Sequence, residues 1–351
     1  MVTGAARPGA LPSAGSVLDA ARRHRAAVLL GLVLLTALAA LASLVIGARH
    51  VPAGAVWGAI VSPSGTEDDI VVRSLRLPRT AFGLLAGTAL GVAGALTQGH
   101  TRNPLADPGL LGVTQGAAFA MVLSIFTLGV TGVRTYIWFG FAGALLASVL
   151  VFALGGAGRG GATPLTLALA GAAVTAFLHG LVAGLVLIDQ QAMDTYRFWQ
   201  AGALAGRDAG VLPALLPFVL AGLVLAMVNA PALNALALGE DVARSLGHRI
   251  RLARAVGITA ITLLTGAAVA ACGALAFLGL IVPHLARALS GPDHRWLLPF
   301  SGLLGAALLL AADVTGRLVA RPGEVEVGIM LALIGGPFFI ALVRRRKPVR
   351  L

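Results

Sequence analysis

The chain has 351 residues, of which 58% are hydrophobic and 11% are charged, and its formal net charge is +12. Soluble domains usually carry about 25% charged residues. With a mean hydropathy of +0.92, this chain has too few polar residues to form the surface of a soluble protein. The one cysteine, Cys272, excludes a disulfide framework and a CxxC metal site. The one lysine, Lys347, precedes Pro348 and cannot complete a phosphate-binding loop, which needs Gly-Lys-Ser/Thr.

Stretches without a charged residue run through the chain, and nine of them reach the about 17–25 residues with which a helix crosses a bilayer. They are 26–48, 80–101, 108–133, 135–158, 160–188, 209–239, 255–286, 296–312 and 327–343. The stretch 255–286 is too long for one span at about 1.5 Å per residue, and we expect it to divide near Gly273. In 209–239, Pro231 and its polar neighbours favour a loop at the end of the span. The sequence therefore predicts an all-α polytopic membrane protein with about ten transmembrane helices.

Basic residues flank the outermost spans and predict the topology. The flanks are Arg-Arg-His-Arg at 22–25 and Arg-Arg-Arg-Lys at 344–347. Basic flanks stay in the cytoplasm, and ten spans place both termini there. Seventeen of the 26 basic and five of the 14 acidic residues then lie inside, so the net charge is +12 inside and zero outside. Membrane topology therefore accounts for the whole net positive charge. We expect the chain to interact with the lipid bilayer and not with nucleic acid.

The predicted organisation is a cytoplasmic tail over residues 1–25, a membrane domain over 26–343 and a basic cytoplasmic tail over 344–351. A weak internal repeat runs through the membrane domain, with an offset of 179 positions. It matches Gly87, Ala89, Gly94, Ala95, Leu96 and Pro104 with Gly266, Ala268, Gly273, Ala274, Leu275 and Pro283. Units five spans apart are inverted relative to each other, so we expect two inverted five-helix halves, a frequent transporter architecture.

The densest polar cluster in the apolar bulk is the segment 98–114, which contains two prolines. Proline cannot continue a helix, so we expect a break between the second and third spans. The break is either a tight loop or irregular backbone beside a pathway, because such backbone is tolerated at membrane depth only within protein or along a cavity. The residues of this break or pathway are Gln98, Asn103, Pro104, Pro108, Gly112 and, in the repeat, Pro283.

Arginines gather at the predicted outer face, against the topological bias. Arg73, Arg76 and Arg79 precede the second span, and Arg317 and Arg321 end the ninth. One interpretation is interfacial arginines that pair with nearby carboxylates. The carboxylates available for such pairs are Glu67, Asp68, Asp69, Glu324 and Glu326. The other interpretation is a docking surface for an acidic extracytoplasmic partner, since arginine forms bidentate pairs with carboxylates.

The longest predicted inner segment is 236–254. Glu240 and Arg244 are four residues apart, which supports a helix. Apolar residues recur every fourth position from Val242, and Gly247 is a natural helix stop. We expect two short helices on the inner surface, which either lie in the membrane interface or fit into a groove of a cytoplasmic partner.

Enzyme signatures are absent from the sequence: it has no HExxH or GxSxG motif, and its seven histidines never stand at metal-ligand spacing. We therefore expect no catalytic residue, no metal site and no cofactor. Asp313 is the one acidic residue inside an apolar span that a proton relay could use. It stands four residues before Arg317, so an ion pair within the helix is the favoured explanation.

Taken together, these clusters resemble the FecCD-type permeases of ABC importers, a family that takes up iron–siderophore complexes, haem and cobalamin. The resemblance runs in family order from about residue 70 to residue 343. Its motifs are LRLPR at 75–79, GVAG at 91–94 with Gln98, RNPLA at 102–106 with Pro108, LGV at 111–113, LGE at 238–240, ARSLG at 243–247, GLIVPH at 279–284, DHR at 293–295, AAD at 311–313 and GGPF at 335–338.

The resemblance implies ten spans per subunit, a second permease subunit in a homo- or heterodimer, two cytoplasmic ABC ATPase subunits and an extracytoplasmic substrate-binding protein. It also implies a bacterial cytoplasmic membrane with both termini inside. The docking arginines of the family match Arg76, Arg79 and Arg317. Its ATPase-coupling residues match Leu238, Gly239, Glu240, Ala243, Arg244, Leu246 and Gly247.

We therefore interpret the chain as the permease subunit of an iron–siderophore importer, with ATP hydrolysis by a partner and not by this chain. Haem or cobalamin import by the same family is the alternative substrate. A proton-coupled secondary transporter that uses Asp313 is the alternative from a different class.

Overall fold

The computed structural model describes residues 14–47, 49, 51–130, 132–157 and 163–344, and its regular elements over these residues are all helices. They are α1 (Ala14–Val45), α2 (Ala53–Val61), α3 (Glu67–Ile70), η1 (Val71–Arg76), α4 (Leu77–Thr101), η2 (Pro108–Leu111), α5 (Val113–Leu128), α6 (Val133–Gly156), α7 (Pro164–Ile188), α8 (Gln190–Ala201), η3 (Ala209–Val211), α9 (Leu212–Ala237), α10 (Glu240–Ser245), α11 (Ile250–Cys272), α12 (Leu278–Ser290), α13 (His294–Val319) and α14 (Val327–Arg344).

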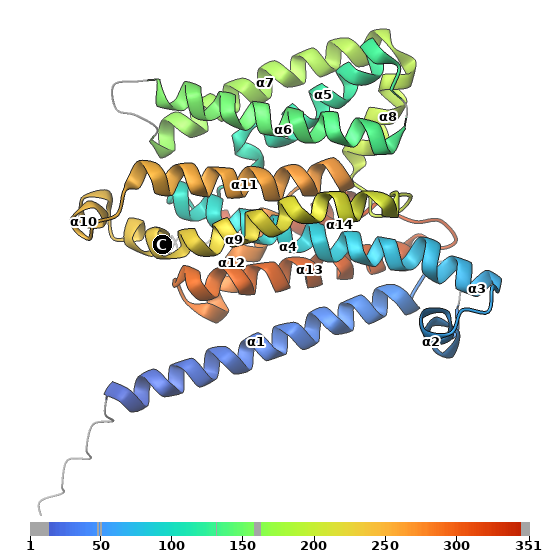
Figure 1. Ribbon diagram of the computed structural model, residues 1–351, viewed down its shortest axis with the longest axis horizontal. Helices are drawn as coiled ribbons and strands as arrows, with labels where there is room; N and C mark the ends of the chain where they lie inside the picture. The colour runs from blue at the N-terminus through green and yellow to red at the C-terminus, as the bar shows by residue number, and fades with distance from the viewer. Residues whose placement is uncertain (1–13, 48, 50, 131, 158–162, 345–351) are drawn as a thin grey trace, which may run out of the picture.

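The helices that can cross a membrane agree with the predicted number. Eight helical segments of the described chain are long and apolar enough to span, and the two shorter apolar helices α5 and α12 bring the total to ten. These ten lie roughly parallel in the bundle, while the short helices α2, α3 and α10 lie at its ends (Figure 1). The prediction of an all-α polytopic protein is confirmed.

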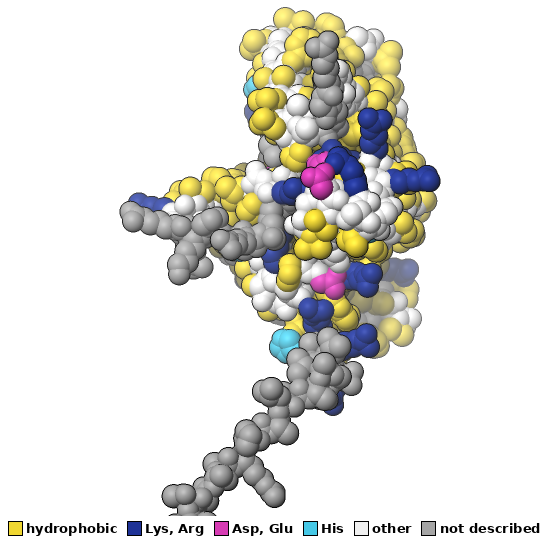
Figure 2. Space-filling model, turned by 90° about the vertical axis from the view of Figure 1, so that its left-hand side faces the viewer, with side chains coloured by type: hydrophobic (Ala, Val, Ile, Leu, Met, Phe, Trp, Pro, Cys, Tyr) yellow, Lys and Arg dark blue, Asp and Glu magenta, His cyan; other side chains and the backbone are white. Residues whose placement is uncertain are grey.

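The two ends of the bundle differ in charge. The start of α1 and all of α10 lie at one end, called here the α10 end, and α2, α3 and η1 lie at the other, the α3 end (Figure 1). Lys and Arg side chains gather over the α10 end, with Asp and Glu at only a few places (Figure 2). The α10 end is therefore rich in basic side chains, as the charge count predicts for the cytoplasmic side.

Glycine faces bring the central helices together. In α4 and α11, 78% of the apolar window is buried, whereas the values are 17% for α1 and 22% for α14. A Cβ added to Gly87 of α4 would lie 2.6 Å from the carbonyl oxygen of Gly305 in α13. Within a bilayer the hydrophobic effect does not drive helices together, and small residues let them pack closely enough for van der Waals contact. The outer helices keep wide apolar faces because lipid or a partner covers them.

A break precedes the third helix of each half of the bundle. The first half contains α1, α4, α5, α6 and α7, and the second contains α9, α11, α12, α13 and α14. Residues 102–112 separate α4 from α5, and residues 273–277 separate α11 from α12. Gly273 has φ 82°, so the division predicted at this glycine is confirmed. Because α4 runs toward the α10 end and α11 runs away from it, the two halves are inverted (Figure 1).

Three local expectations need correction. Helix α9 continues through Pro231 to Ala237 instead of ending in a loop, because neighbouring helices can satisfy the backbone that a proline frees in a membrane helix. Only one short helix, α10, occupies the segment 236–254, since α9 and α11 extend into its two ends. In the repeat, Pro283 lies inside α12, so the counterpart of the first break is 273–277.

The predicted tails are covered only in part. Residues 14–25 of the expected N-terminal tail already belong to α1. Residues 1–13 of that tail and 345–351 of the C-terminal tail lie outside the described residues.

Candidate functional site

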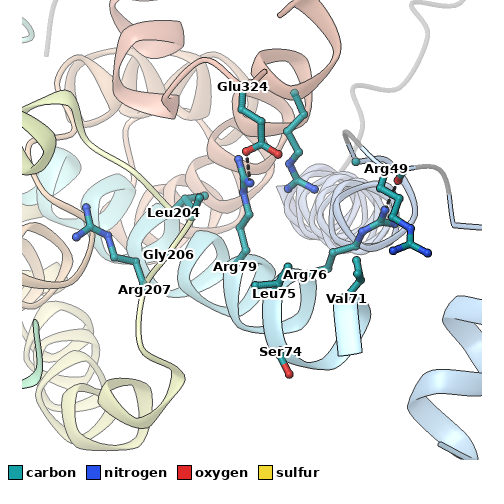
Figure 3. Close-up of a pocket in the computed structure, with 13 residues that line it drawn as sticks. Arg49, Val71, Ser74, Leu75, Arg76, Arg79, Leu204, Gly206, Arg207 and Glu324 are labelled. Atoms are coloured by element: carbon teal, nitrogen blue, oxygen red, sulfur yellow. Dashed lines mark hydrogen bonds and ion pairs between the residues drawn. The ribbon is translucent and has the colours of Figure 1, made fainter. Parts of the chain in front are cut away.

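A pocket of about 460 Å³ opens at the α3 end, between the end of α1, the start of α4, the loop before η3 and the loop after α13 (Figure 3). We call it the arginine pocket, because arginines dominate its charged lining. It is lined by Gly47, Arg49, Val71, Ser74, Leu75, Arg76, Arg79, Leu204, Ala205, Gly206, Arg207, Arg317 and Glu324. Five of these residues are arginines and one is a carboxylate, so the pocket favours an acidic partner.

A fully buried carboxylate, Asp313, lies behind the pocket and joins two of its arginines. Arg79 of α4 donates to Asp313 from Nη2 at 2.8 Å and from Nε at 3.0 Å. Arg317, one turn after Asp313 in α13, donates from Nε at 3.1 Å. Arg79 also pairs with Glu324 Oε2 at 2.5 Å. We call Asp313, Arg79 and Arg317 the Asp313 cluster.

The predicted ion pair between Asp313 and Arg317 is confirmed. Asp313 accepts hydrogen bonds from both guanidiniums, Arg79 and Arg317. This arrangement does not favour a proton relay at Asp313. The pairing of Arg79 with Glu324 agrees with the interpretation that the outer arginines find carboxylates within the chain.

Two arginines of the pocket, Arg317 and Arg76, cap the end of α1. Arg317 Nη1 donates to the carbonyl oxygens of Ser43 and Ile46, both at 2.8 Å. Arg76 Nη1 donates to Leu44 O at 2.8 Å and Val45 O at 2.7 Å. The last carbonyls of a helix have no partners within it and carry partial negative charge, which two cations satisfy here. These bonds attach α1 to the bundle, although little of its surface is buried.

The arginines named for docking differ in exposure. Arg76 is 5% exposed and Arg317 is 1% exposed, whereas 10% of the Arg79 side chain is accessible at the pocket. All three guanidiniums are bonded within the chain, and Arg79 is the most exposed of the three. Docking by these residues stays a prediction.

Sequence reasoning missed two other arginines of the pocket, Arg49 and Arg207. Arg49 is exposed and pairs with Glu67 Oε2 at 3.1 Å. Arg207 is partly exposed and donates to Ala203 O at 3.1 Å and to Cys272 O at 3.3 Å. The neighbouring Asp208 pairs with Arg134 instead, and these hydrogen bonds hold the pKa of the Asp208 carboxyl below its usual range. The sequence signal that could have identified Arg207 is its position on the predicted outer face, directly after Gly206.

At the α10 end, one carboxylate gathers three arginines from three elements. Glu240 of α10 pairs with Arg254 of α11 at 2.5 Å and with Arg244 of α10 at 3.1 Å. Arg102, the C-cap of α4, approaches Glu240 at 4.0 Å. We call these four residues the Glu240 cluster. It ties the short helix to the ends of two central helices.

The remaining residues predicted for coupling form a knob. Gly239 with φ 115° and Gly247 with φ 83° bracket α10, where a left-handed conformation favours glycine. Leu238 is 67% exposed and Leu246 is 60% exposed, while Ala243 packs inside. The two exposed leucines flank α10, and their role in coupling stays a prediction.

Two of the residues predicted for the helix break, Gln98 and Pro108, lie against α12. Gln98 is buried, donates to Leu280 O at 3.3 Å and accepts from Arg287 at 3.2 Å. Pro108 abuts Gly279, where an added Cβ would come within 2.5 Å of the proline ring. Asn103 and Pro104 lie in the turn before Pro108, and Gly112 is left-handed with φ 71°. The structure thus brings the first break to the start of α12, and its role in a pathway stays a prediction.

Comparisons with known proteins match most of the chain. The model of the FecCD transport family matches residues 34–345. The chain is 47% identical to the ferric enterobactin transport system permease protein FepD of Escherichia coli, over 92% of this chain and 96% of FepD. It is 43% identical to the iron(3+)-hydroxamate import system permease protein FhuB of Bacillus subtilis, over 91% and 83% of the two chains. It is 36% identical to the hemin transport system permease protein HmuU of Yersinia pestis, over 91% and 96%.

Among solved structures, the chain is similar to a metal-chelate-type ABC transporter in an inward-facing conformation. The TM-score is 0.79 and the sequence identity is 30%, over 92% of this chain and 99% of the other.

Asp313→Asn tests the Asp313 cluster. Removing the charge leaves two buried guanidiniums with too few carboxylates, which typically costs about 3–5 kcal/mol of folding free energy. We expect a marked fall in the thermal unfolding temperature of the purified chain in detergent. In Asp313→Asn with Arg317→Gln, the cluster is balanced again by Glu324 and Arg79, and part of the loss should return. A double variant no more stable than Asp313→Asn would contradict the charge balance.

Proposed function

Because the chain belongs to the FecCD transport family, whose members are permease subunits of ABC transporters, we propose that it forms the translocation pathway of an iron–siderophore importer. The observation that carries this substrate class is the 47% identity with the ferric enterobactin permease over nearly the whole of both chains. The hydroxamate permease supports the same class at 43%. The relatives named for hemin and cobalamin, at 36% and 40%, keep haem and cobalamin as the second candidate substrates.

The assembly that we propose has a second permease subunit, two cytoplasmic ABC ATPases and an extracytoplasmic binding protein. The chain has one lysine and no phosphate-binding loop of the Gly-Lys-Ser/Thr type, so the energy of ATP must come from partner subunits. Apolar faces on α7 and α14, whose spanning windows are 28% and 22% buried, are available to a second permease. We propose that the α10 end faces the cytoplasm of a bacterial inner membrane, which its basic surface supports (Figure 2).

Coupling to the ATPases is proposed at α10. Leu238 and Leu246 would enter a groove of the ATPase, and the Glu240 cluster would carry the movement of α10 to α4 and α11. Arg102 ends α4 directly before the first break, and Pro108 of that break contacts Gly279 of α12. A displacement of α10 would thus have a packed route to the first break and to the start of α12.

Docking of the binding protein is proposed at the α3 end. Acidic side chains of the loaded binding protein would enter the arginine pocket and meet Arg79, Arg49 and Arg207. Arg76 and Arg317 would contribute from beneath, because they fix the end of α1 against α4 and α13. The two partners then act on opposite ends of one bundle (Figure 1).

Uptake in a deletion strain tests the substrate. The strain lacks this permease gene and is supplied with labelled ferric catecholate siderophore, ferric hydroxamate siderophore, haem and cobalamin in parallel. We expect the chain to restore uptake of at least one ferric siderophore. Restoration of haem or cobalamin uptake alone would contradict the proposed substrate.

Glu240→Gln tests coupling. The neutral amide cannot hold three guanidiniums, so we expect uptake to fall about tenfold or more while the complex still inserts and hydrolyses ATP. Asp241→Asn is the matched control, since the Asp241 side chain is 97% exposed and forms its ion pair with Arg244 of the same short helix. Assays of ATPase rate and uptake in proteoliposomes separate the two effects. Equal uptake by both variants would remove the cluster from the coupling route.

Arg49→Gln with Arg207→Gln tests docking. Both side chains line the pocket, so we expect the binding protein to bind the permease complex about tenfold more weakly at low salt, with a smaller difference at high salt. Arg197→Gln on α8 is the control, because this exposed arginine lies outside the pocket. Unchanged affinity in the double variant, measured by surface plasmon resonance, would rule out docking at this pocket.

A further inference from the structure

A second hollow lies on the side of the bundle, between α6 and α11. Its volume is about 260 Å³. The two helices pack side by side, and neither end of the bundle forms part of the hollow (Figure 1). It is lined by Leu145, Ser148, Val149 and Phe152 of α6 and by Ala255, Ile258, Thr259 and Thr262 of α11. We call it the α6–α11 groove. Its lining carries no charge, as expected for a surface at membrane depth.

The lining residues of α11 form one stripe, and an arginine continues it. Ala255, Thr259 and Thr262 are three to four residues apart and therefore share a helix face. Arg251 precedes Ala255 by one turn on that face and stands in the first turn of α11, at the α10 end. From Ala255 to Thr262 the groove follows α11 for about 10 Å toward the middle of the bundle. The positively charged Arg251 therefore lies beyond the α10 side of the uncharged α6–α11 groove.

Among the residues that the structure describes, no carboxylate forms an ion pair with Arg251. Arg251 is exposed, and the nearby carboxylate of Glu240 is occupied by Arg254, Arg244 and Arg102. Asp241 pairs with Arg244. The positive end of the α11 dipole adds to the cation at this point. The edge of the groove is thus prepared for an anion.

The size of the groove decides what kind of molecule can occupy it. A helix of a protein partner is about 10–12 Å wide with its side chains and does not fit a slot of 260 Å³ between two helices. A single acyl chain is narrow enough, and lipid is the solvent of this flank. Basic sites between spanning helices on the cytoplasmic side are suited to acidic head groups.

We propose that the α6–α11 groove binds one acyl chain of an anionic phospholipid whose phosphate pairs with Arg251. The chain lies along Ala255, Ile258 and Thr259, and the head group stays at the α10 end. A zwitterionic lipid offers the same acyl chain, but its ammonium group offsets the attraction of its phosphate to the arginine. The site is therefore selective for the head group and depends on the acyl chain for occupancy.

Native mass spectrometry of the purified full chain tests the site. The protein is stripped of lipid in detergent and titrated with phosphatidylglycerol or phosphatidylcholine of identical acyl chains. For the first bound lipid we expect about fivefold tighter binding of phosphatidylglycerol, the factor that one arginine near an anionic lipid surface supplies. Phosphatidylglycerol with a photoactivatable acyl chain should label peptides within 145–152 and 255–262.

Three variants separate the two parts of the site. Arg251→Gln should remove the preference for phosphatidylglycerol and keep an acyl chain bound. Ala255→Phe should fill the groove and abolish both the first binding step and the labelling, without unfolding, because residue 255 is exposed. Arg249→Gln removes an equally exposed charge that precedes α11, and it should keep the preference.

Three results would overturn the proposal. They are equal binding of the two lipids by the unaltered chain, the same loss of preference in Arg249→Gln as in Arg251→Gln, or labelling of other helices only. Transport does not enter these readouts, so they are independent of the proposed function.

Discussion

The α3 end of this protein depends on one buried carboxylate, Asp313. A charge without water is costly unless opposite charges and hydrogen bonds surround it, and here two guanidiniums from two helices do so. The same arginines reach outward, Arg79 to Glu324 and Arg317 to the last carbonyls of α1. Separating α1, α4 or α13 would leave a buried charge without its partners. The cluster therefore holds the end of α1, the start of α4 and the end of α13 together.

The two ends of the bundle differ in a way that suits their proposed partners. At the α3 end Arg76 and Arg317 are buried and bonded to backbone carbonyls, which fixes the floor of the arginine pocket. At the α10 end the Glu240 cluster is partly exposed and joins a six-residue helix to α4 and α11. Between them lies the first helix break, whose Pro108 contacts Gly279 at the start of α12. In the proposed assembly, a movement at α10 would thus reach the middle of the bundle while the arginine pocket keeps its shape.

Local sequence information predicted much of this fold and less of the site. Charge-free lengths indicated the number of spans, Gly273 marked the division of one stretch, and i,i+4 spacing indicated the pair of Asp313 with Arg317. The contact of Arg79 with Asp313 joins residues 234 positions apart, so no local pattern could predict it. Arg76 likewise bonds carbonyls, which leave no trace in the sequence. Pro231 misled because tertiary contacts in a membrane tolerate proline within a helix.

Amide hydrogen exchange of the full chain in lipid nanodiscs tests most directly whether the Asp313 cluster holds the α3 end together. The comparison is between the unaltered chain and Arg317→Met, which removes the bonds to Asp313, Ser43 and Ile46. We predict faster exchange at residues 42–47 and at the start of α4, with no change over 236–247. Unchanged exchange at 42–47, or an equal rise at both ends of the bundle, would contradict the account.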